Sequence, residues 1–408
     1  MADFGATELD AFRAEVRDWL AANYPPALKD PHVKVHPEAM WGGRQFEGSD
    51  DPHVAWIRVL ASRGYTAPTW PKEYGGGELS AAQAKILAEE LSAGGYRTPA
   101  LASFGLWMLG PVLLEYGNEA QKKEHLPKIV RGEIRWCQGY SEPGAGSDLA
   151  SLQTRCEDKG GHWLINGQKI WTSYANRADW CFCLVRTDTA HKHEGVSFIL
   201  IDMASPGVET RPIKLISGES PFCETFFTDV KVPKENLVGQ VNRGWEIAKR
   251  LLQYERQNIS GGFGSGGGAG GAAGDLGKIA RRHIGVDETG ALADADLRGR
   301  ITRNKMDFQA FYLTLERIAA ESRAGNGPNA ATSIVKYAAA AFAQERSELM
   351  VEAMGARALG WEGEGFAPAE LIATRGWLRS KGNSIEGGTS EVNLNVVAKR
   401  VLGLPDPK

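Results

Sequence analysis

The spacing of hydrophobic residues changes twice along the 408-residue chain, and this change limits the fold more than any other feature. Residues 1–137 and 239–408 repeat apolar side chains every three or four positions, as amphipathic helices do. Residues 138–238 are rich in β-branched and aromatic side chains between turns, which indicates strands. We therefore expect an α+β multidomain chain: an N-terminal helical domain, a middle β-barrel or β-sandwich domain and a C-terminal helical bundle.

Capping residues locate several helix ends in the outer regions. Ser80 is a candidate N-cap, and Gly94 with Gly95 should end the same helix. In the last region, residues 242–260 are amphipathic and residues 334–360 are rich in helix formers. One face of the first helix is expected to carry Leu9, Phe12, Val16, Trp19 and Leu20.

The middle region contains a strong hairpin signal. Asn166-Gly167 stands between two β-prone arms within residues 162–171, and this dipeptide favours a two-residue turn. Further strands are expected within residues 179–188, 195–203 and 223–233.

Charge and hydropathy exclude several function classes. The net charge of −3 gives no basis for nucleic-acid binding. No apolar run reaches the ~18 residues that a transmembrane helix needs. The N-terminus carries early acidic residues and lacks the apolar core of a signal peptide, so a cytoplasmic location is predicted.

Cysteine and histidine usage gives no sign of disulfides or metals. The chain has five cysteines and no Cys-x-x-Cys pair, so we expect reduced thiols in the core. His191 and His193 lack a third ligand at a familiar spacing and are interpreted as part of a solvated loop.

A glycine-rich segment, Gly261–Gly274, holds nine glycines in fourteen residues. It matches G-x-G-x-x-G, but a polar helical segment precedes it, where a dinucleotide-binding fold needs a hydrophobic strand. We interpret it as a weakened helix or a closely packed loop that leaves room for a ligand, with a flexible linker as the alternative.

A second loop, "GYSEPGAGSDLASL" at residues 139–152, joins the first region to the middle one. Its glycines permit close backbone approach, and Tyr140, Ser141 and Ser147 offer hydroxyls and N–H groups. Such a loop suits a polar ring edge or a phosphate. Pro143 rules out a nucleophile elbow at Ser141.

Together with "INGQKIWTSYANRADW", "FFTDVKVPKENLVGQVNRGW" and "IEGGTSEVNLNVVAKRVLGLP", this loop resembles the acyl-CoA dehydrogenase family. The resemblance covers residues 55–404 with the motifs in the right order. It implies a C-terminal four-helix bundle, FAD bound without a dinucleotide fold, and a dimer or tetramer. It also implies an acyl-CoA substrate, fatty-acid β-oxidation, and electron transfer to an electron-transferring flavoprotein.

The resemblance assigns roles to individual residues. Tyr140 and Ser141 would hydrogen-bond the flavin pyrimidine edge, Trp171 would lie against the ring, and Ser173 would bond near N5. The remaining implied FAD contacts are Gln138, Gly146, Ser147, Thr389 and Glu391, and the implied substrate contacts are Ser147, Arg256, Glu386 and Gly387. A plain core tryptophan is the alternative for Trp171.

The catalytic base is the main departure from medium-chain relatives, which carry a glutamate where this chain has Gly387. Isovaleryl-type and long-chain relatives instead use a glutamate directly before an arginine on an earlier helix. Glu255-Arg256 matches that pair, so Glu255 is the predicted base, with Glu386 as the weaker candidate. An intrahelical ion pair is the structural alternative for Glu255.

The family's Arg-x-x-Phe-Gly motif, which serves the FAD of a neighbouring subunit, is absent, and Arg281 or Arg282 is only a weak substitute. The glycines after Glu255 suggest a wide pocket for a bulky or branched, ring-bearing acyl group. Two alternatives stay open: a non-catalytic or half-site subunit of a hetero-oligomer, and a flavin oxidase or monooxygenase on the same fold.

Overall fold

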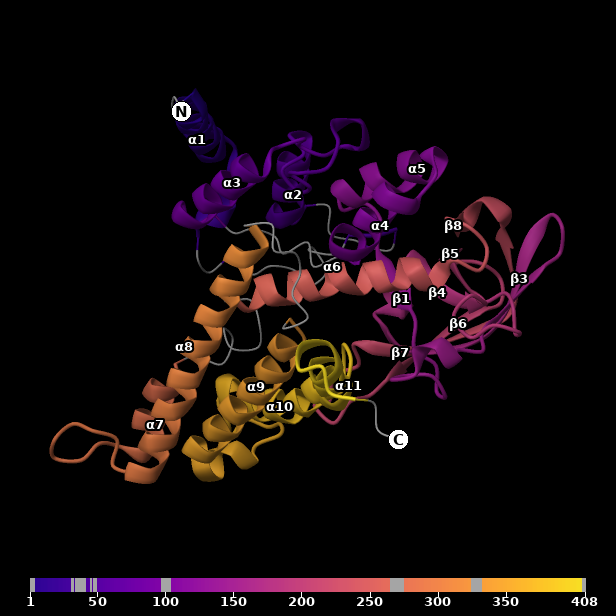
Figure 1. The fold of residues 1–408 in the computed structure, drawn as a ribbon. Helices are drawn as coiled ribbons and strands as arrows, with labels where there is room; N and C mark the ends of the chain where they lie inside the picture. Colours follow the sequence, from indigo (N-terminus) through magenta and orange to yellow (C-terminus); the bar gives the residue numbers. More distant parts are fainter. Residues whose placement is uncertain are drawn as a thin grey trace. The chain divides into compact units, whose positions relative to one another are not determined.

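The computed structural model describes residues 4–30, 33, 42–44, 46, 50–96, 104–264, 275–323 and 332–405. The chain forms two compact units (Figure 1). Unit 1 combines Met1–Ile213 with Pro221–Tyr254, and unit 2 combines Lys214–Ser220 with Glu255–Lys408. The expected order of helices, strands and helices is confirmed, while the domain boundaries at 137/138 and 238/239 stay predictions.

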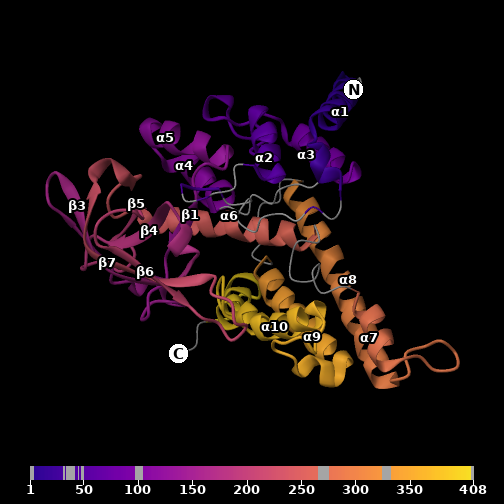
Figure 2. The ribbon, with the colours of Figure 1, turned by 180° about the vertical axis from the view of Figure 1, so that it is seen from behind.

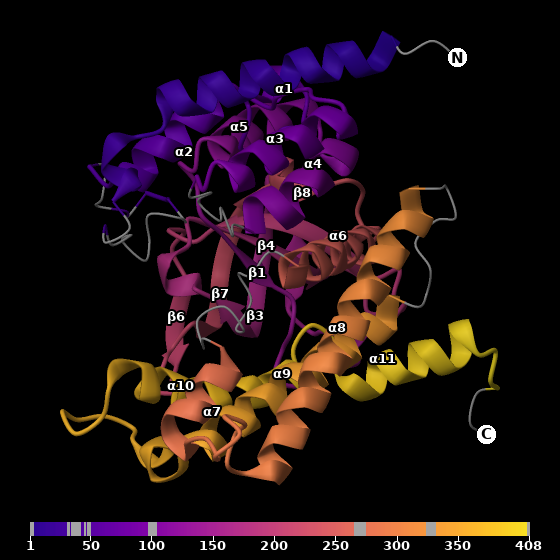
Figure 3. The same ribbon diagram turned by 90° about the vertical axis from the view of Figure 1, so that its left-hand side faces the viewer.

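Helices make up the first part of unit 1. They are α1 (Phe4–Asn23), α2 (Pro52–Ser62), α3 (Ala81–Ala93), α4 (Gly110–Tyr116) and α5 (Glu119–Val130). α1 packs on α3 through its predicted apolar face, where Val16 and Leu20 are fully buried (Figure 3). Ser80 caps α3 in a reciprocal pair with Gln83, and the helix ends before Gly94, as predicted.

The strands of unit 1 form one sheet. They are β1 (Trp136–Gly139), β2 (Arg155–Asp158), β3 (His162–Ser173), β4 (Trp180–Arg186), β5 (Val196–Asp202), β6 (Val208–Ile213), β7 (Phe222–Pro233) and β8 (Leu237–Val238). Their order is β6-β7-β3-β2-β4-β5-β8, and β1 pairs with β4 in parallel. Figure 2 shows the strands from behind.

Strand β4 explains the continuous apolar run in its sequence. Phe182 and Leu184 lie in a core shared with the helices of unit 1, while Cys181 and Cys183 lie in a second core within the β-sheet. Because successive side chains point to opposite faces, a strand buried on both sides needs apolar residues at every position. All five cysteines of the chain are buried and free, as predicted.

The hairpin predicted at Asn166-Gly167 is wrong, because β3 runs unbroken through both residues. The ladder with β7 shifts register between Ile165 and Gly167, which makes the dipeptide a bulge. The Asn166 amide donates to Asp229 Oδ1 over 3.0 Å and accepts from the Asp229 N–H over 2.9 Å. These bonds to β7 satisfy the asparagine within a strand, so no turn is needed.

In the described part of unit 2 the regular elements are helices, and the segment Lys214–Ser220 contains none. Its helices are α7 (Leu276–Ile284), α8 (Ala295–Arg323), α9 (Thr332–Met354), α10 (Pro368–Ser380) and α11 (Ser390–Val396). α9 is central, because it contacts each of the other four. In the short segment, Gly218 lies against the ring of Trp361.

Helix α6 (Gly244–Gly264) contributes residues to both units. Ile247, Ala248 and Leu251 of its first half are buried in the core of unit 1. The glycine-rich segment is helical as far as Gly264, and its remaining residues lie outside the described ones. None of the helices described here combines the length and apolar character needed to cross a membrane.

Candidate functional site

The predicted cofactor loop forms a narrow turn after β1. A Cβ on Gly139 would lie 2.8 Å from the sulfur of a cysteine on β4, so the close strand packing requires glycine here. Glu142 and Ala145 exchange two backbone hydrogen bonds of 3.0 Å, which close the turn. A Cβ on Gly144 or Gly146 would meet no atom within 4 Å, so this side of the turn is accessible to a ligand.

Trp171 is held in an uncommon conformation at the end of β3. The β3–β7 ladder shifts register between Lys169 and Thr172, and within this bulge the Trp171 φ is +61°. Bulky residues rarely adopt the left-handed region, and such strain often marks a functional position. The indole is 52% exposed and meets the Phe222 ring edge-on, with the ring centroids 6.2 Å apart. The alternative of a core tryptophan is therefore wrong.

A buried ion pair joins the loop to β3. Lys169 Nζ donates to Glu142 Oε1 over 2.7 Å and to the Tyr140 carbonyl over 3.1 Å. The Lys169 side chain is 0% exposed and that of Glu142 is 7% exposed. The same carboxylate accepts the backbone N–H groups of Gln153 and Thr154 over 2.6 and 2.8 Å.

Two opposing effects act on the Glu142 carboxyl. Burial alone would raise its pKa, because a charge is poorly solvated inside the protein. The Lys169 charge and the three hydrogen bonds outweigh burial, so the pKa of Glu142 lies below its ordinary value. The Glu142 carboxyl is therefore ionised at neutral pH.

Ser141 presents a free donor next to this pair. Its carbonyl accepts the Ile170 N–H over 2.9 Å, which ties the loop to the residue before Trp171. Within the described part of the chain, the Ser141 N–H makes no hydrogen bond. A flavin ring combines acceptors on its pyrimidine edge with a flat aromatic face, so an open N–H and an exposed indole on adjoining segments fit it.

The other predicted FAD contacts of unit 1 are spread around this point. Gln138 pairs with Phe182 within the sheet, and the Tyr140 side chain is buried. Ser147 is exposed, while Ser173 is half-buried and pairs with Phe222. The structure thus brings Ser141, Trp171 and Ser173 onto adjoining segments, and their individual roles stay predictions.

The predicted residues of unit 2 surround the start of α11. Thr389 is the N-cap, and its hydroxyl accepts the Val392 N–H over 3.2 Å. Glu391 is exposed in the first turn, and Gly387 has φ +62°. Glu386 accepts a hydrogen bond of 2.7 Å from Arg379, so this carboxylate is already neutralised by an ion pair. That engagement weakens its candidacy as the base.

Glu255 and Arg256 lie on α6, but their side chains are outside the described residues, so both roles stay predictions. The residue before them is well defined. The Tyr254 hydroxyl donates to Glu115 Oε2 over 3.0 Å, and Arg250 Nε bonds the same oxygen over 2.8 Å. Arg281 and Arg282 are exposed on α7.

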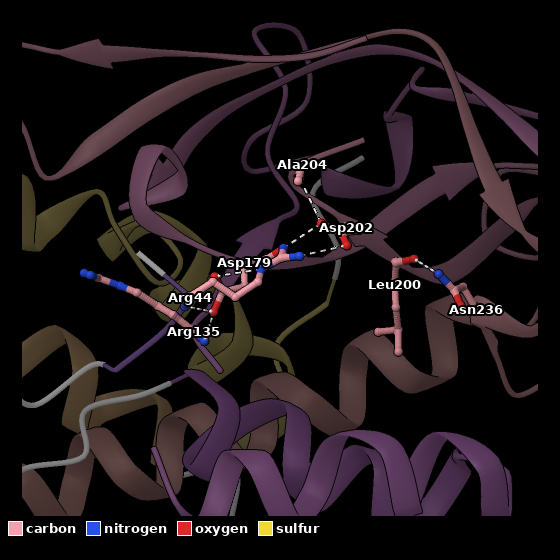
Figure 4. A network of polar contacts seen from close by, with 7 residues as sticks. All are labelled: Arg44, Arg135, Asp179, Leu200, Asp202, Ala204 and Asn236. Carbon is pink, nitrogen blue, oxygen red and sulfur yellow. Dashed lines mark hydrogen bonds and ion pairs between the residues drawn. The ribbon is translucent and has the colours of Figure 1, made fainter. Parts of the chain in front are cut away.

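A second polar cluster in unit 1 surrounds Asp179 (Figure 4). The Arg44 guanidinium bonds Asp179 Oδ1 over 3.1 Å and Asp202 Oδ1 over 2.6 Å. The backbone N–H groups of Arg44 and Arg135 donate to the Asp179 carboxylate over 2.9 and 2.8 Å. A hollow of about 370 Å³ lies alongside, and among the described residues that line it the cation is Arg44, which is bound to carboxylates. We interpret the cluster as a structural clamp.

The loop with the two histidines is exposed, as predicted. His191 pairs with Asp188 over 2.8 Å, and the His193 ring lies 5.0 Å from that of Trp245. The paired Asp188 carboxylate raises the pKa of His191.

Sequence reasoning missed the roles of Lys169, Glu142 and Arg44. Lys169 had a signal, because it shares its strand parity with Trp163 and Ile165, and both are buried. A lysine on the inner face of a strand needs a buried partner. Arg44 had no signal, because its partners Asp179 and Asp202 are more than a hundred residues away.

Comparison with known proteins shows which family has this architecture. Family models for the acyl-CoA dehydrogenase N-terminal, middle and C-terminal domains match residues 6–133, 137–230 and 242–402. The acyl-CoA dehydrogenase IpdE1 of Mycolicibacterium smegmatis is 36% identical over 417 residues, covering 98% of each chain.

Two solved structures are similar over nearly the whole chain. One is described as the Tcur3481-Tcur3483 steroid ACAD, with 29% identity, a TM-score of 0.73 and 98% coverage of both chains. The other is the ChsE4-ChsE5 complex from Mycobacterium tuberculosis, with 27% identity, a TM-score of 0.72 and 98% coverage of both chains. The three consecutive domain matches and the full-length relative establish that the chain belongs to the acyl-CoA dehydrogenase family of FAD-dependent oxidoreductases, which act on the CH–CH bond of acyl-CoA thioesters.

Proposed function

We propose that this chain introduces the trans-2 double bond into a bulky, ring-bearing acyl-CoA. The observation that carries the proposal is the exposed Trp171, held in a left-handed conformation on a segment bonded to Ser141. An exposed indole face and an N–H without a partner among the described residues suit contact with a flavin ring better than a purely structural role for this segment. The ring-bearing substrate is supported by the similarity to a steroid ACAD and by the glycines that follow Glu255.

In this proposal the chain's residues divide into cofactor contacts and a base. Ser141 would hold the flavin pyrimidine edge through its N–H, Trp171 would lie against the ring, and Ser173 would bond near N5. Bound FAD supplies the acceptor for the substrate's β-hydride. Glu255 removes the α-proton, and a pocket that excludes water keeps this carboxylate basic enough for the task.

We further propose that the enzyme works with a second subunit of the same family and passes electrons to an electron-transferring flavoprotein. The similarity to the ChsE4-ChsE5 complex supports a two-chain enzyme. So does the glycine at position 387, together with the absence of Arg-x-x-Phe-Gly. If the partner supplied the base, this chain would be a half-site subunit, which is the second candidate function.

Anaerobic loss of flavin absorbance tests the reaction and its substrate. FAD-loaded protein is mixed with octanoyl-CoA, isovaleryl-CoA and the CoA thioester of a bile acid, alone and after co-expression with candidate partner chains. We expect the bile-acid thioester to reduce the flavin fastest. Faster reduction by octanoyl-CoA would overturn the ring-bearing assignment, and rapid peroxide formation in air would favour the oxidase alternative.

Three variants test the base. Glu255→Gln should slow flavin reduction by at least ~100-fold, because general-base catalysis is lost. Glu246→Gln, an exposed position on the same helix, is the matched control and should react at the wild-type rate. Undiminished reduction in Glu255→Gln, with loss in Glu386→Gln, would move the base to Glu386. Undiminished reduction in both would favour a base on the partner subunit.

A further inference from the structure

We propose that Lys169 and Glu142 act as positioning residues that set the reduction potential of bound FAD through the Tyr140–Ser141 peptide. The inference rests on the proposed contact between the Ser141 N–H and the flavin. It adds a role for a buried pair that touches neither cofactor nor substrate in that scheme.

The first step is the orientation of one peptide group. Lys169 Nζ donates to the Tyr140 carbonyl over 3.1 Å. The described backbone has no cis peptide bonds, so this carbonyl and the Ser141 N–H point in opposite directions. The ammonium therefore fixes the N–H so that it points away from Lys169. The next carbonyl, that of Ser141, is held by Ile170, so the segment is fixed on both sides of this N–H.

The second step is polarisation. A cation bonded to a carbonyl oxygen withdraws electron density along the peptide and strengthens the N–H on its other side as a donor. Lys169 is fully buried, so water does not screen its charge. The Ser141 N–H is thus a stronger donor than an ordinary backbone amide. Hydrogen bonds and charges close to the ring are a main means by which proteins tune cofactors.

The third step is the opposing charge. Glu142 lies 2.7 Å from the ammonium, and its other bonds go to the backbone N–H groups of Gln153 and Thr154. Its carboxylate stabilises the buried lysine and limits the positive potential at the peptide. Reduced FAD carries more negative charge than oxidised FAD. Lys169 should therefore favour the reduced form, and Glu142 should moderate that preference.

The test uses the FAD-loaded protein and measures the flavin potential by anaerobic spectroelectrochemistry. Lys169→Met should weaken binding of reduced relative to oxidised FAD by at least tenfold, a fall of about 30 mV for a two-electron couple. Glu142→Gln should move the potential in the opposite direction, because the lysine loses its counter-charge. A merely structural pair would not produce shifts of opposite sign.

Either single variant leaves a buried charge unpaired and could fail to fold, so the double variant Lys169→Met/Glu142→Gln is measured as well. It carries no charge at either position, and its potential should lie below the wild-type value, because no ammonium polarises the peptide. Glu209→Gln removes an exposed pair with Arg211 on β6 of the same sheet and should leave the potential unchanged. A wild-type potential in the double variant would overturn the proposal.

A separate variant distinguishes failure of this inference from failure of the proposed site. Trp171→Leu should weaken FAD binding and restore the fluorescence of the bound flavin, because a stacked indole quenches it. If Trp171→Leu has both effects while the Lys169 and Glu142 variants all have the same flavin reduction potential, only the tuning role is wrong. If Trp171→Leu changes neither affinity nor fluorescence, the flavin site itself is misplaced, and the tuning role is overturned with it.

Discussion

The Tyr254 hydroxyl donates a 3.0 Å hydrogen bond to Glu115 Oε2, which joins α6 to α4 at the residue directly before Glu255. Arg250 bonds the same carboxylate oxygen one helical turn earlier. The three side chains thus fix the rotation of α6 against α4 at this point. Since a helix is stiff over one residue, this contact also fixes the helix backbone at position 255.

We expect Tyr254→Phe to separate this positioning from stability. The free energy of unfolding should fall by only about 1 kcal/mol, because the hydrogen bond to the partly exposed Glu115 carboxylate is lost. The rate of anaerobic flavin reduction should fall several-fold if Glu255 is the base, because small misplacements of a base are costly. Thermal denaturation and stopped-flow absorbance measure the two effects. An unchanged reduction rate would show that this contact does not orient the base.

Asp179→Asn should destabilise unit 1. The carboxylate accepts the Arg44 side chain and the N–H groups of Arg44 and Arg135, and it is 2% exposed. Losing its charge should lower the free energy of unfolding by about 2 kcal/mol, because charged hydrogen bonds are the strong ones. Denaturation by urea measures the change.

The matched control for this cluster is Asp202→Asn. Asp202 pairs with the same guanidinium but is 32% exposed, so its loss should cost less than about 1 kcal/mol. Equal effects of the two substitutions would contradict the view that burial makes Asp179 the centre of the clamp.

Gly167→Ala tests the bulge that replaced the predicted hairpin. A Cβ at this position would lie 2.6 Å from Thr154 Oγ1 and 2.7 Å from its Cα, so β3 would have to move away from the residue that precedes β2. We expect a loss of about 1–3 kcal/mol, as for other overpacked sites. Gly161→Ala, in the turn between the same strands, would meet no atom within 4 Å and should stay within about 0.5 kcal/mol of wild type. Similar urea denaturation midpoints for the two variants would refute the close contact between position 167 and Thr154.

His125 should make stability depend on pH. Its ring lies 5.1 Å from those of Trp136 and Trp180, and burial lowers its pKa from 6.5 to about 4. Above pH 6.5 the imidazole is neutral in both states and contributes nothing. As the pH falls from 6.5 to 4, the unfolded chain binds a proton that the folded chain does not, so stability falls.

The full loss should reach about 3 kcal/mol. His125→Phe keeps the aromatic packing and removes the titration, so its unfolding free energy should decline less than that of wild type between pH 7 and pH 4. Urea denaturation at several pH values compares the two proteins. Parallel curves would mean that His125 is not the group responsible.

Local sequence patterns predicted the helices and strands well where residues close together in the sequence determine them. The N-cap at Ser80 and the apolar face around Val16 and Leu20 depend on neighbours within a few residues. The glycines and polar residues at 139–152 likewise indicated the loop that follows β1. The hairpin prediction at Asn166-Gly167 failed because Asp229, sixty-three residues later, hydrogen-bonds the Asn166 side-chain amide within the sheet, so no turn is needed.

The sequence by itself determined the order of helices and strands, the family motifs and the types of residue available for flavin chemistry, because these follow from local spacing and composition. Only the tertiary structure decided that Trp171 is turned outward, that the Ser141 N–H has no hydrogen-bond partner among the described residues, and that Lys169 is paired with Glu142. These features depend on register and burial, which arise when distant strands pair. A lysine in a β-strand pattern looks like a solvated residue until the fold removes the water around it.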